Sequence, residues 1–547
     1  MNTVVERLIE SWLDSQTERR YQPAFIQLLI SEGWSVVHNT RHSPIEFGKD
    51  VIARSPDGVL HCFQLKGNPG GRVTKRDAQG LLSQVLELLE TPAPGLYRAA
   101  PDERHVAVFV TNGTVDEEAT LLFSEAAQRT SKDTCPASSF ILVTRGELLS
   151  RFVKAAGRVW PTSVEGTRLL LNVGAEDGRS LPDPQLIGAV LAETAPPPGA
   201  DASQPERNAN LSALLLIGEV LKAPWYSAAN HYGLHALTIL VTMHALRFAD
   251  NPARKAAVTG YATLAVEHCR DLLLEAQSRG FRGDIVWADT SLLGEFDIMW
   301  ERRRLVADCA AVLLLSGFDL EPELRRYAGE LVTASVAAPR LWGLGAVPAF
   351  IVRNWAQRRI DATLAPDLAL GVTLKALVRS ARAEDSAVPL YGPYFTFLDC
   401  WAVGHGVRHL GNDAIFRESA GNSLWFGKAL LMMLAKRNLK QTCKEIWPGF
   451  SRLVHEEADL PTESFYDPRL TNAGGLQTET FHRKEWRDLV QESVDESGAS
   501  FLDGHDELAW MIASYVSLVP YRAWTSVLMW LDHRLAPSSY GPGRIPE

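Results

Sequence analysis

The chain has 547 residues, of which 46% are hydrophobic and 22% are charged. This composition is that of a globular protein and argues against disordered, collagen-like and coiled-coil classes. At roughly 150 residues per domain, the length suggests about three or four domains. The net charge of −10 excludes the overall basic field that is typical of proteins that bind nucleic acid over a broad surface.

The sequence predicts a cytoplasmic protein that does not enter the membrane. Its six cysteines include no CxxC pair, so we expect neither a disulfide scaffold nor a cysteine-based zinc site. Glu6, Glu10 and Asp14 interrupt the apolar pattern near the N-terminus, which argues against a signal peptide. Apolar runs elsewhere fall well short of the roughly 18 residues that a membrane-spanning helix needs.

Composition shifts along the chain predict its domains. Residues 193–208 contain three consecutive prolines followed by small polar residues, a pattern typical of an extended linker. Helix and strand signals mix over residues 1–156, and residues 157–192 form an ambiguous appendage. Residues 209–535 carry almost only helical signals, and 536–547 are expected to be a flexible tail. The predicted fold is an α/β domain followed by a large all-α domain.

The N-terminal segment indicates a central mixed sheet flanked by helices. The pattern predicts helices over residues 4–13, 19–32, 74–90 and 146–155, and strands over 46–54, 59–66, 105–111 and 139–144. Capping boxes at Thr74 with Asp77 and at Thr114 with Glu117 are expected to start two helices. Strands separated by helices at this spacing imply parallel βαβ units. In the appendage we expect a strand over 167–173 and a helix over 185–191.

The hairpin formed by the first two of these strands fixes a register. Gly58 is expected to take a positive φ in a three-residue loop, so that Ser55 pairs with Val59. Counting back along both strands then places Asp50 opposite Gln64. A loop one residue shorter would bring Phe63 opposite Asp50 instead and would separate the two polar groups.

Lys66 lies on the same strand face as Gln64, because side chains alternate along a strand. Residues 47–50 (FGKD) followed by residues 64–66 (QLK) resemble the GxD…QxK variant of the PD-(D/E)XK nucleases, above all the Mrr-type restriction endonucleases. The segments at 109–113 and 141–148 are also similar to that family. The resemblance covers residues 16–155 in the family's order, and it implies a restriction-endonuclease-like fold.

The resemblance implies a metal-dependent site for phosphodiester hydrolysis. Asp50 would supply a carboxylate and Gln64 a carbonyl oxygen to Mg²⁺ or Mn²⁺, which prefer oxygen ligands. Lys66 would position the attacking water or stabilise the charge of the transition state. The family adds an acidic or amide residue from the preceding helix. Gln22 is nearest to that position and Glu18 is the acidic alternative, and the sequence leaves both open.

Contacts with nucleic acid must come from a local surface, since residues 1–155 carry 17 Lys+Arg and 19 Asp+Glu. Arg72, Lys75 and Arg76 follow a glycine-rich segment and are candidates for phosphate contacts, with a solvated loop as the alternative. Gln84 is a candidate for facing the substrate, with a position on the flank of its helix as the alternative.

Two histidine pairs with i, i+4 spacing do not predict a metal site. His231 with His235 and His405 with His409 have the spacing of zinc ligands, but neither pair belongs to an HExxH motif. We interpret all four as ordinary helix histidines.

Three hypotheses follow. The first is a metal-dependent endonuclease that cleaves DNA, with RNA as an open alternative, in bacterial defence against foreign DNA. Its helical domain would regulate or assemble it, as a homo-oligomer or through a partner protein or ligand. The second is a catalytically inactive nuclease fold that binds DNA or protein. The third is a helical scaffold with a structural N-terminal domain.

Overall fold

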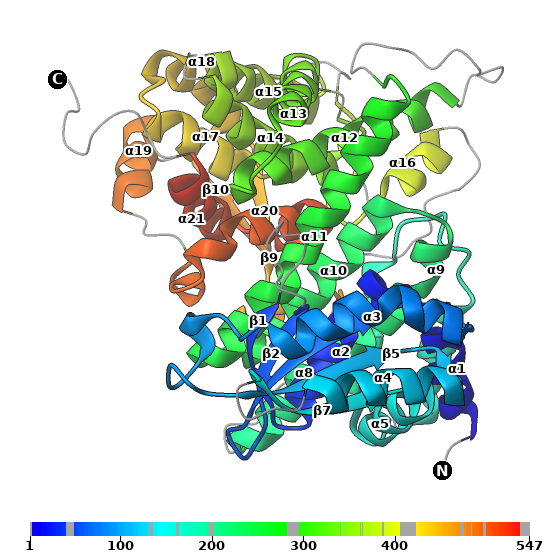
Figure 1. Cartoon of the computed structure of the whole chain (residues 1–547). Coiled ribbons are helices and arrows are strands. Elements are labelled where there is room, and N and C mark those ends of the chain that lie inside the picture. The colour runs from blue at the N-terminus through cyan, green and yellow to red at the C-terminus, as the bar shows by residue number, and fades with distance from the viewer. Residues whose placement is uncertain are drawn as a thin grey trace. The chain divides into compact units, whose positions relative to one another are not determined.

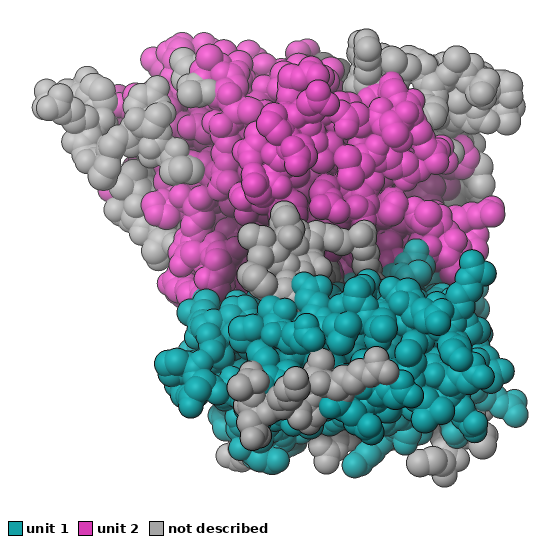
Figure 2. All heavy atoms as spheres, in the orientation of Figure 1, with its two compact units in different colours: residues 1–176, 189–224, 245–256 teal, residues 177–188, 225–244, 257–547 magenta. Residues whose placement is uncertain are grey.

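The structure is a computed structural model whose packing divides the chain into two compact units (Figure 2). Unit 1 comprises residues 1–176, 189–224 and 245–256, and unit 2 comprises residues 177–188, 225–244 and 257–547. The structure describes residues 3–39, 49–130, 135–159, 163–195, 202–281, 295–339, 341–361, 363, 365–384, 388–404, 423–470, 475–482, 484–495 and 499–536.

Unit 1 contains a sheet with helices on both faces (Figure 1). Its strands are β1 (Ser35–Asn39), β2 (Val51–Arg54), β3 (Leu60–Lys66), β4 (Arg72–Val73), β5 (His105–Thr111), β6 (Thr114–Val115) and β7 (Ala137–Val143). Its helices are α1 (Thr3–Ser15), α2 (Glu18–Ser31), α3 (Lys75–Glu90), α4 (Glu117–Thr130), α5 (Arg145–Val159), α6 (Val164–Gly174) and α8 (Gln204–Leu221). Helices α7 (Pro184–Thr194) and α9 (Ala223–Ser227) each contain residues of both units.

The main sheet of unit 1 is mixed, as predicted. Its five strands lie in the order β1-β2-β3-β5-β7, with β1, β2 and β3 antiparallel and β3, β5 and β7 parallel. Helices α3 and α4 follow β3 and β5 and bury a core that includes Cys62, Val85, Phe109 and Phe123. On the other face, Phe25 of α2 packs edge-on against Phe63 at 5.4 Å between ring centroids. Burial of such side chains from water is the main force that closes the sheet.

The hairpin register is confirmed. Val51 pairs with Phe63 and Arg54 with Leu60, and the Ser55 amide donates to the Val59 carbonyl at 3.0 Å. Gly58 closes the loop with a φ of +83°, a conformation that costs glycine little because it has no Cβ. The same register, continued one pair further, puts Asp50 opposite Gln64.

Two local predictions in unit 1 are wrong. Thr114 does not cap a helix, because it lies in β6 and pairs with Arg72 of β4 in a small parallel ladder. The capping box at Thr74 and Asp77 is confirmed. Residues 167–173 are helical, within α6, because Ser163 caps that helix and its Leu170 and Val173 side chains are buried at helical spacing. Strand β1 was not predicted.

The compact units do not divide at the predicted linker. Helix α8 follows the proline-rich segment, yet it packs against α2 and α5 of unit 1. Its buried leucines, including Leu211, Leu214 and Leu215, supply the apolar surface for this packing. Residues 177–188 belong to unit 2. The division of the chain is therefore set by which apolar faces pack together and not by the position of the proline-rich segment in the sequence.

Unit 2 is mostly helical. Its helices are α10 (His231–Ala245), α11 (Pro252–Ser278), α12 (Glu295–Ser316), α13 (Pro322–Ala337), α14 (Val347–Ile360), α15 (Ala365–Ala381), α16 (Phe397–Gly404), α17 (Gly427–Lys436), α18 (Lys440–Phe450), α19 (Trp486–Asp495), α20 (Ala509–Leu518) and α21 (Thr525–Leu535), with the first residues of α11 and the last residue of α10 in unit 1. Among the residues that the structure describes, no helix has both the length and the apolar character to cross a membrane.

The expectation that this region is all-α is wrong in one place. Strands β8 (Ser423–Trp425), β9 (Val454–Asp459) and β10 (Gly475–Thr480) form a three-stranded sheet in the order β10-β9-β8. In β9, His455 and Ala458 are buried while their neighbours are more exposed. The sequence did not predict this sheet because its strands are short and carry charged residues. Such segments are stable as strands only when they pair with neighbouring strands.

His231 and His235, the histidine pair within the described residues, both contact protein groups. His235 is buried, with Nδ1 2.9 Å from the Ala265 carbonyl and Nε2 2.8 Å from the Ser514 hydroxyl. His231 lies 3.8 Å from the Glu275 carboxylate. His405 and His409 lie outside the described residues.

Acid is expected to destabilise unit 1 through His105. Burial lowers the pKa of this fully buried imidazole to about 4, against 6.5 ordinarily. Between those values the unfolded chain binds a proton that the folded chain does not, so the free energy of unfolding falls as pH drops from 6.5 to 4. The loss is up to about 3 kcal/mol from this residue. Urea denaturation at pH 7 and pH 4.5 should show a smaller loss for His105→Gln than for wild type. The exposed His482→Gln protein serves as the control, and an unchanged loss in His105→Gln would contradict the prediction.

Candidate active site

The hairpin brings Asp50 and Gln64 into direct contact. The Gln64 Nε2 atom donates to Asp50 Oδ2 at 2.8 Å, and the Leu65 amide donates to the same oxygen at 2.6 Å. Both side chains are buried, with 8% and 6% exposed fractions. Two donors to one carboxylate oxygen fix the orientation of the group. The carboxylate of Asp50 and the amide of Gln64 are therefore held in a fixed orientation relative to each other.

Lys66 pairs with the acidic candidate of the preceding helix. Its Nζ lies 3.1 Å from Glu18 Oε2, and the two side chains are 21% and 35% exposed. This contact depends on Gly67. A Cβ at that position would lie 2.1 Å from the Glu18 backbone nitrogen, so only glycine lets the first turn of α2 reach the end of β3.

Gln22 also lies at the site, so the structure brings both alternatives together. Its Nε2 is 3.5 Å from the Asp50 carbonyl oxygen, and the side chain is 6% exposed. Glu18 contacts the lysine, whereas Gln22 contacts the backbone of the aspartate. The two residues therefore hold different parts of the site.

Tyr21 was not predicted, and it anchors α2 to the sheet. Its hydroxyl donates toward the carbonyl oxygens of Lys66, at 3.2 Å, and Val110, at 3.3 Å. Burial, assisted by the carboxylates of Glu18 and Asp50, raises its pKa well above the usual value. The hydroxyl is therefore protonated and neutral, and the carboxylates of Glu18 and Asp50 lie close enough to affect its pKa.

Lys49, next to Asp50 in the chain, is buried and fixes the start of β2. Its Nζ donates to the Thr91 carbonyl at 2.8 Å, at the C-terminal end of α3. A cation is favoured there by the helix dipole and the unpaired carbonyls. Burial lowers the pKa of this lysine. Phe47 and Gly48, the other residues of the motif, lie outside the described residues.

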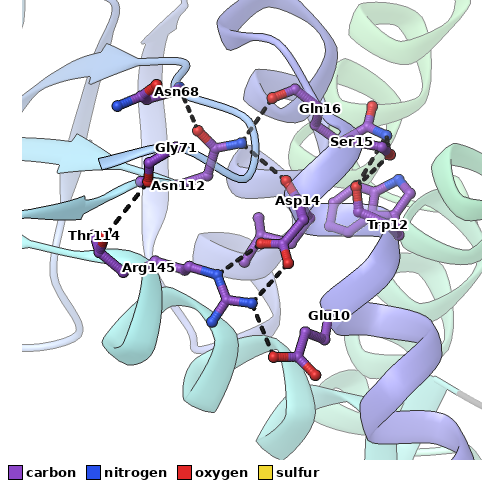
Figure 3. Close-up of polar contacts among 12 residues, drawn as sticks. Glu10, Trp12, Asp14, Ser15, Gln16, Asn68, Gly71, Asn112, Thr114 and Arg145 are labelled. Atoms are coloured by element: carbon purple, nitrogen blue, oxygen red, sulfur yellow. Dashed lines mark hydrogen bonds and ion pairs between the residues drawn. The ribbon is translucent and has the colours of Figure 1, made fainter. Parts of the chain in front are cut away.

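A buried amide joins the end of β5 to α1 beside the site (Figure 3). Asn112 Nδ2 donates to the carbonyls of Leu13, at 2.9 Å, and Gln16, at 2.7 Å. Its Oδ1 accepts from the Asn68 amide at 2.7 Å. One side chain thus connects the segment after β3 with the segment that leads into α2.

Arg145 makes a second connection to α1 (Figure 3). Its Nε and Nη2 bond the two carboxylate oxygens of Asp14 at 2.6 and 2.7 Å, and Nη2 also bonds Glu10 at 2.8 Å. Both carboxylates raise the pKa of the guanidinium further above its usual range. Paired, forked contacts of this kind fix orientation as well as distance.

The Asn112→Ala substitution is expected to destabilise the protein by about 2–4 kcal/mol, because it removes three hydrogen bonds to backbone groups, two of which are buried. Urea denaturation measures this effect. The matched control is Thr114→Ala, which removes an exposed hydroxyl 3.4 Å from the Gly71 carbonyl and should change stability by less than about 0.5 kcal/mol. Equal effects of the two substitutions would show that the Asn112 network does not hold the fold.

The predicted basic residues lie on an exposed surface of unit 1. Arg72 pairs with Asp116, and Lys75 Nζ lies 3.5 Å from the Glu118 carboxylate. Arg76 is exposed in the first turn of α3. Exposed ion pairs such as these contribute little to stability, so phosphate groups can compete with the carboxylates for these side chains.

Gln84 has a different position from the other candidates. It is half-buried within α3. Its Oε1 is buried and has no hydrogen-bond partner within the described part of the chain. Among the described residues, no hydrogen bond joins this side chain to Asp50 or Gln64.

The donor set suits a hard divalent cation. Asp50 and Glu18 offer carboxylates, and Gln64 offers an amide oxygen that its bond to Asp50 does not use. Oxygen donors of this kind are those that Mg²⁺ and Mn²⁺ prefer. Three or more His, Cys, Asp and Glu side chains arranged to hold a metal do not occur within the described residues.

No protein-family model, curated protein or solved structure matches the chain. Sequence reasoning missed Tyr21, Lys49, Asn112 and Arg145 as residues that hold the site. Lys49, Asn112 and Arg145 lie within segments that resemble the family, but that resemblance gave them no role, because their partners are mainly backbone atoms or residues far away in the chain.

Proposed function

We propose that unit 1 is a metal-dependent endonuclease that hydrolyses DNA phosphodiester bonds. The observation that carries the proposal is the register of the hairpin, which joins Asp50 to Gln64 at 2.8 Å with Lys66 on the same face. The resemblance to the Mrr-type restriction endonucleases supports this reading of the residues.

Each side chain has a chemical role in the proposal. Asp50 and Gln64 would hold Mg²⁺ or Mn²⁺, with Glu18 or Gln22 completing the site. A bound divalent cation lowers the pKa of water and neutralises charge on the phosphate. Lys66 would orient the attacking water or stabilise the negative charge of the transition state. Its pairing with Glu18 keeps the ammonium at the end of β3.

The substrate and setting are inferred from the resemblance and from surface charge. Restriction endonucleases act on DNA, and defence against foreign DNA is the setting that the likeness favours. Arg72, Lys75 and Arg76 would contact phosphates near the site. The net charge of −10 weakens unregulated DNA binding, so unit 2 would regulate or assemble the enzyme.

The test is a cleavage assay with the full-length protein on plasmid DNA and on single-stranded RNA, with Mg²⁺ or Mn²⁺ and with EDTA. Cleavage of DNA that requires the cation is the expected result. Cleavage of RNA but not of DNA would mean that the substrate is RNA. DNA cleavage that persists in EDTA would contradict the proposed metal site.

Gln64→Glu is expected to retain cleavage and to bind Mg²⁺ more tightly, because a carboxylate replaces a neutral ligand without a change of shape. Calorimetric titration with Mg²⁺ and the cleavage assay check this. The Glu also loses the amide donor to Asp50, so urea denaturation is needed alongside. A folded Gln64→Glu protein with weaker Mg²⁺ binding than wild type would show that position 64 does not face the metal.

The second candidate is an inactive nuclease fold that binds DNA. It is favoured by the pairing of Lys66 with Glu18 and by the hydrogen bond that Gln64 makes to Asp50, since both contacts occupy groups that catalysis needs. Fluorescence anisotropy with labelled duplex DNA separates the two candidates. DNA binding without cleavage in the presence of Mg²⁺ or Mn²⁺ would support the inactive nuclease fold.

A further inference from the structure

Unit 2 contains a cavity lined by three arginine side chains. Arg303 and Arg304 come from α12 and Arg353 comes from α14, and the space between them measures about 60 Å³. One ordered water needs only about 10–15 Å³ by a comparable measure. We call this cavity, with its three guanidinium groups, the arginine pocket.

Carboxylates behind the pocket hold two of the guanidinium groups in place. Arg304 Nε donates to Glu301 at 2.7 Å and its Nη1 donates to Asp308 at 2.5 Å, while Arg353 Nη1 donates to the other oxygen of Asp308. The described residues that line the pocket include no carboxylate. The acids therefore orient the arginines from outside the cavity.

Burial makes these cations receptive to an anion. Arg353 is 2% exposed, and burial lowers the pKa of its guanidinium. Its Nε is buried and has no hydrogen-bond partner among the residues that the structure describes. A buried donor without an acceptor is unfavourable, so a ligand that brings oxygen acceptors into the pocket would relieve that cost.

The remaining lining offers contacts for the body of a ligand. The Arg303 guanidinium lies over the Trp300 ring at 4.8 Å from the centroid, and Leu331 and Ser335 of α13 also line the space. The pocket thus combines forked cationic donors with aromatic and apolar surface. Guanidinium forks match phosphate oxygens in pairs.

We propose that the arginine pocket binds the phosphate group of a small phosphorylated molecule. The guanidinium groups that line the cavity offer several N–H donors to phosphate oxygens, and the volume of about 60 Å³ admits one phosphate group. Neither the site in unit 1 nor its chemistry enters this inference, so the two proposals can fail separately.

Isothermal titration of the full-length protein with AMP, inorganic phosphate and adenosine tests the proposal. AMP or inorganic phosphate should bind, and adenosine should not. Tighter binding of AMP than of inorganic phosphate would identify a phosphate ester as the ligand, and equal binding would identify the free anion. No heat from either phosphate compound, or adenosine binding as tightly as AMP, would overturn the proposal.

Matched variants locate the binding. Arg303→Gln should weaken it at least tenfold, whereas the adjacent, exposed Arg302→Gln should leave it unchanged. Because Arg303 is buried, weaker binding by Arg303→Gln can also result from impaired folding. A second pair of variants therefore leaves the arginines unchanged. Ala334 is exposed and lines the pocket, so Ala334→Phe should block the entrance, while Ala337→Phe, exposed one turn further along α13, should not. Equal binding by all four proteins would overturn the assignment.

Discussion

The Asp50→Asn protein is expected to fold and to lose metal-dependent DNA cleavage by at least about a hundredfold. Asparagine can still accept hydrogen bonds from Gln64 Nε2 and from the Leu65 amide, the two donors that orient Asp50. Its side chain carries no charge, so the central anionic ligand of the proposed metal site is lost. Calorimetric titration should show weaker Mg²⁺ binding, and cleavage of plasmid DNA should fall in parallel.

A control in the same hairpin separates charge from position. Asp57 is exposed at the loop, and Asp57→Asn removes an equal charge about one strand length away from the site. It should leave Mg²⁺ binding and cleavage unchanged. An Asp50→Asn protein that cleaves at the wild-type rate would mean that the metal binds elsewhere, and the hairpin assignment would have to be abandoned.

The second large effect is expected for Lys66→Met, which should lower the cleavage rate by about a hundredfold or more while Mg²⁺ binding stays close to that of wild type. Methionine matches the four-atom apolar stem of lysine but has no ammonium group for the transition state. Stability should change little, because the Lys66–Glu18 pair is partly exposed and such pairs contribute little.

The exposed Lys154 of α5 provides the matched control. Lys154→Met changes the net charge of the protein by the same amount and should keep full activity. Rates measured at saturating DNA distinguish loss of catalysis from loss of binding. If Lys66→Met proved to bind DNA poorly yet cleave at the normal rate once saturated, Lys66 would be a substrate-binding residue instead of part of the reaction.

Local patterns in the sequence determined the central part of unit 1. The turn chemistry of residues 55–58 sets the loop length, and side chains alternate along strands. Together these two facts placed Asp50 opposite Gln64, with Lys66 on the same face. The helix cap at Thr74 likewise follows from interactions between residues near one another in the chain. The alternation of strand and helix signals predicted that β3, β5 and β7 run parallel, although the pairing itself joins residues far apart in the chain.

Contacts between distant segments could be decided only by the tertiary structure. Glu18 reaches Lys66 because Gly67 permits a backbone approach that no helical or strand pattern encodes. Helix α8 belongs to unit 1 because its buried leucines pack against α2 and α5, helices far away in the sequence. The sheet β10-β9-β8 and the arginine pocket each combine residues from separate elements of unit 2. Neither could be predicted from a single segment, because each forms only when distant segments pack together. The sequence by itself therefore determined which polar side chains share one face of the hairpin, and the tertiary structure decided which partners hold them.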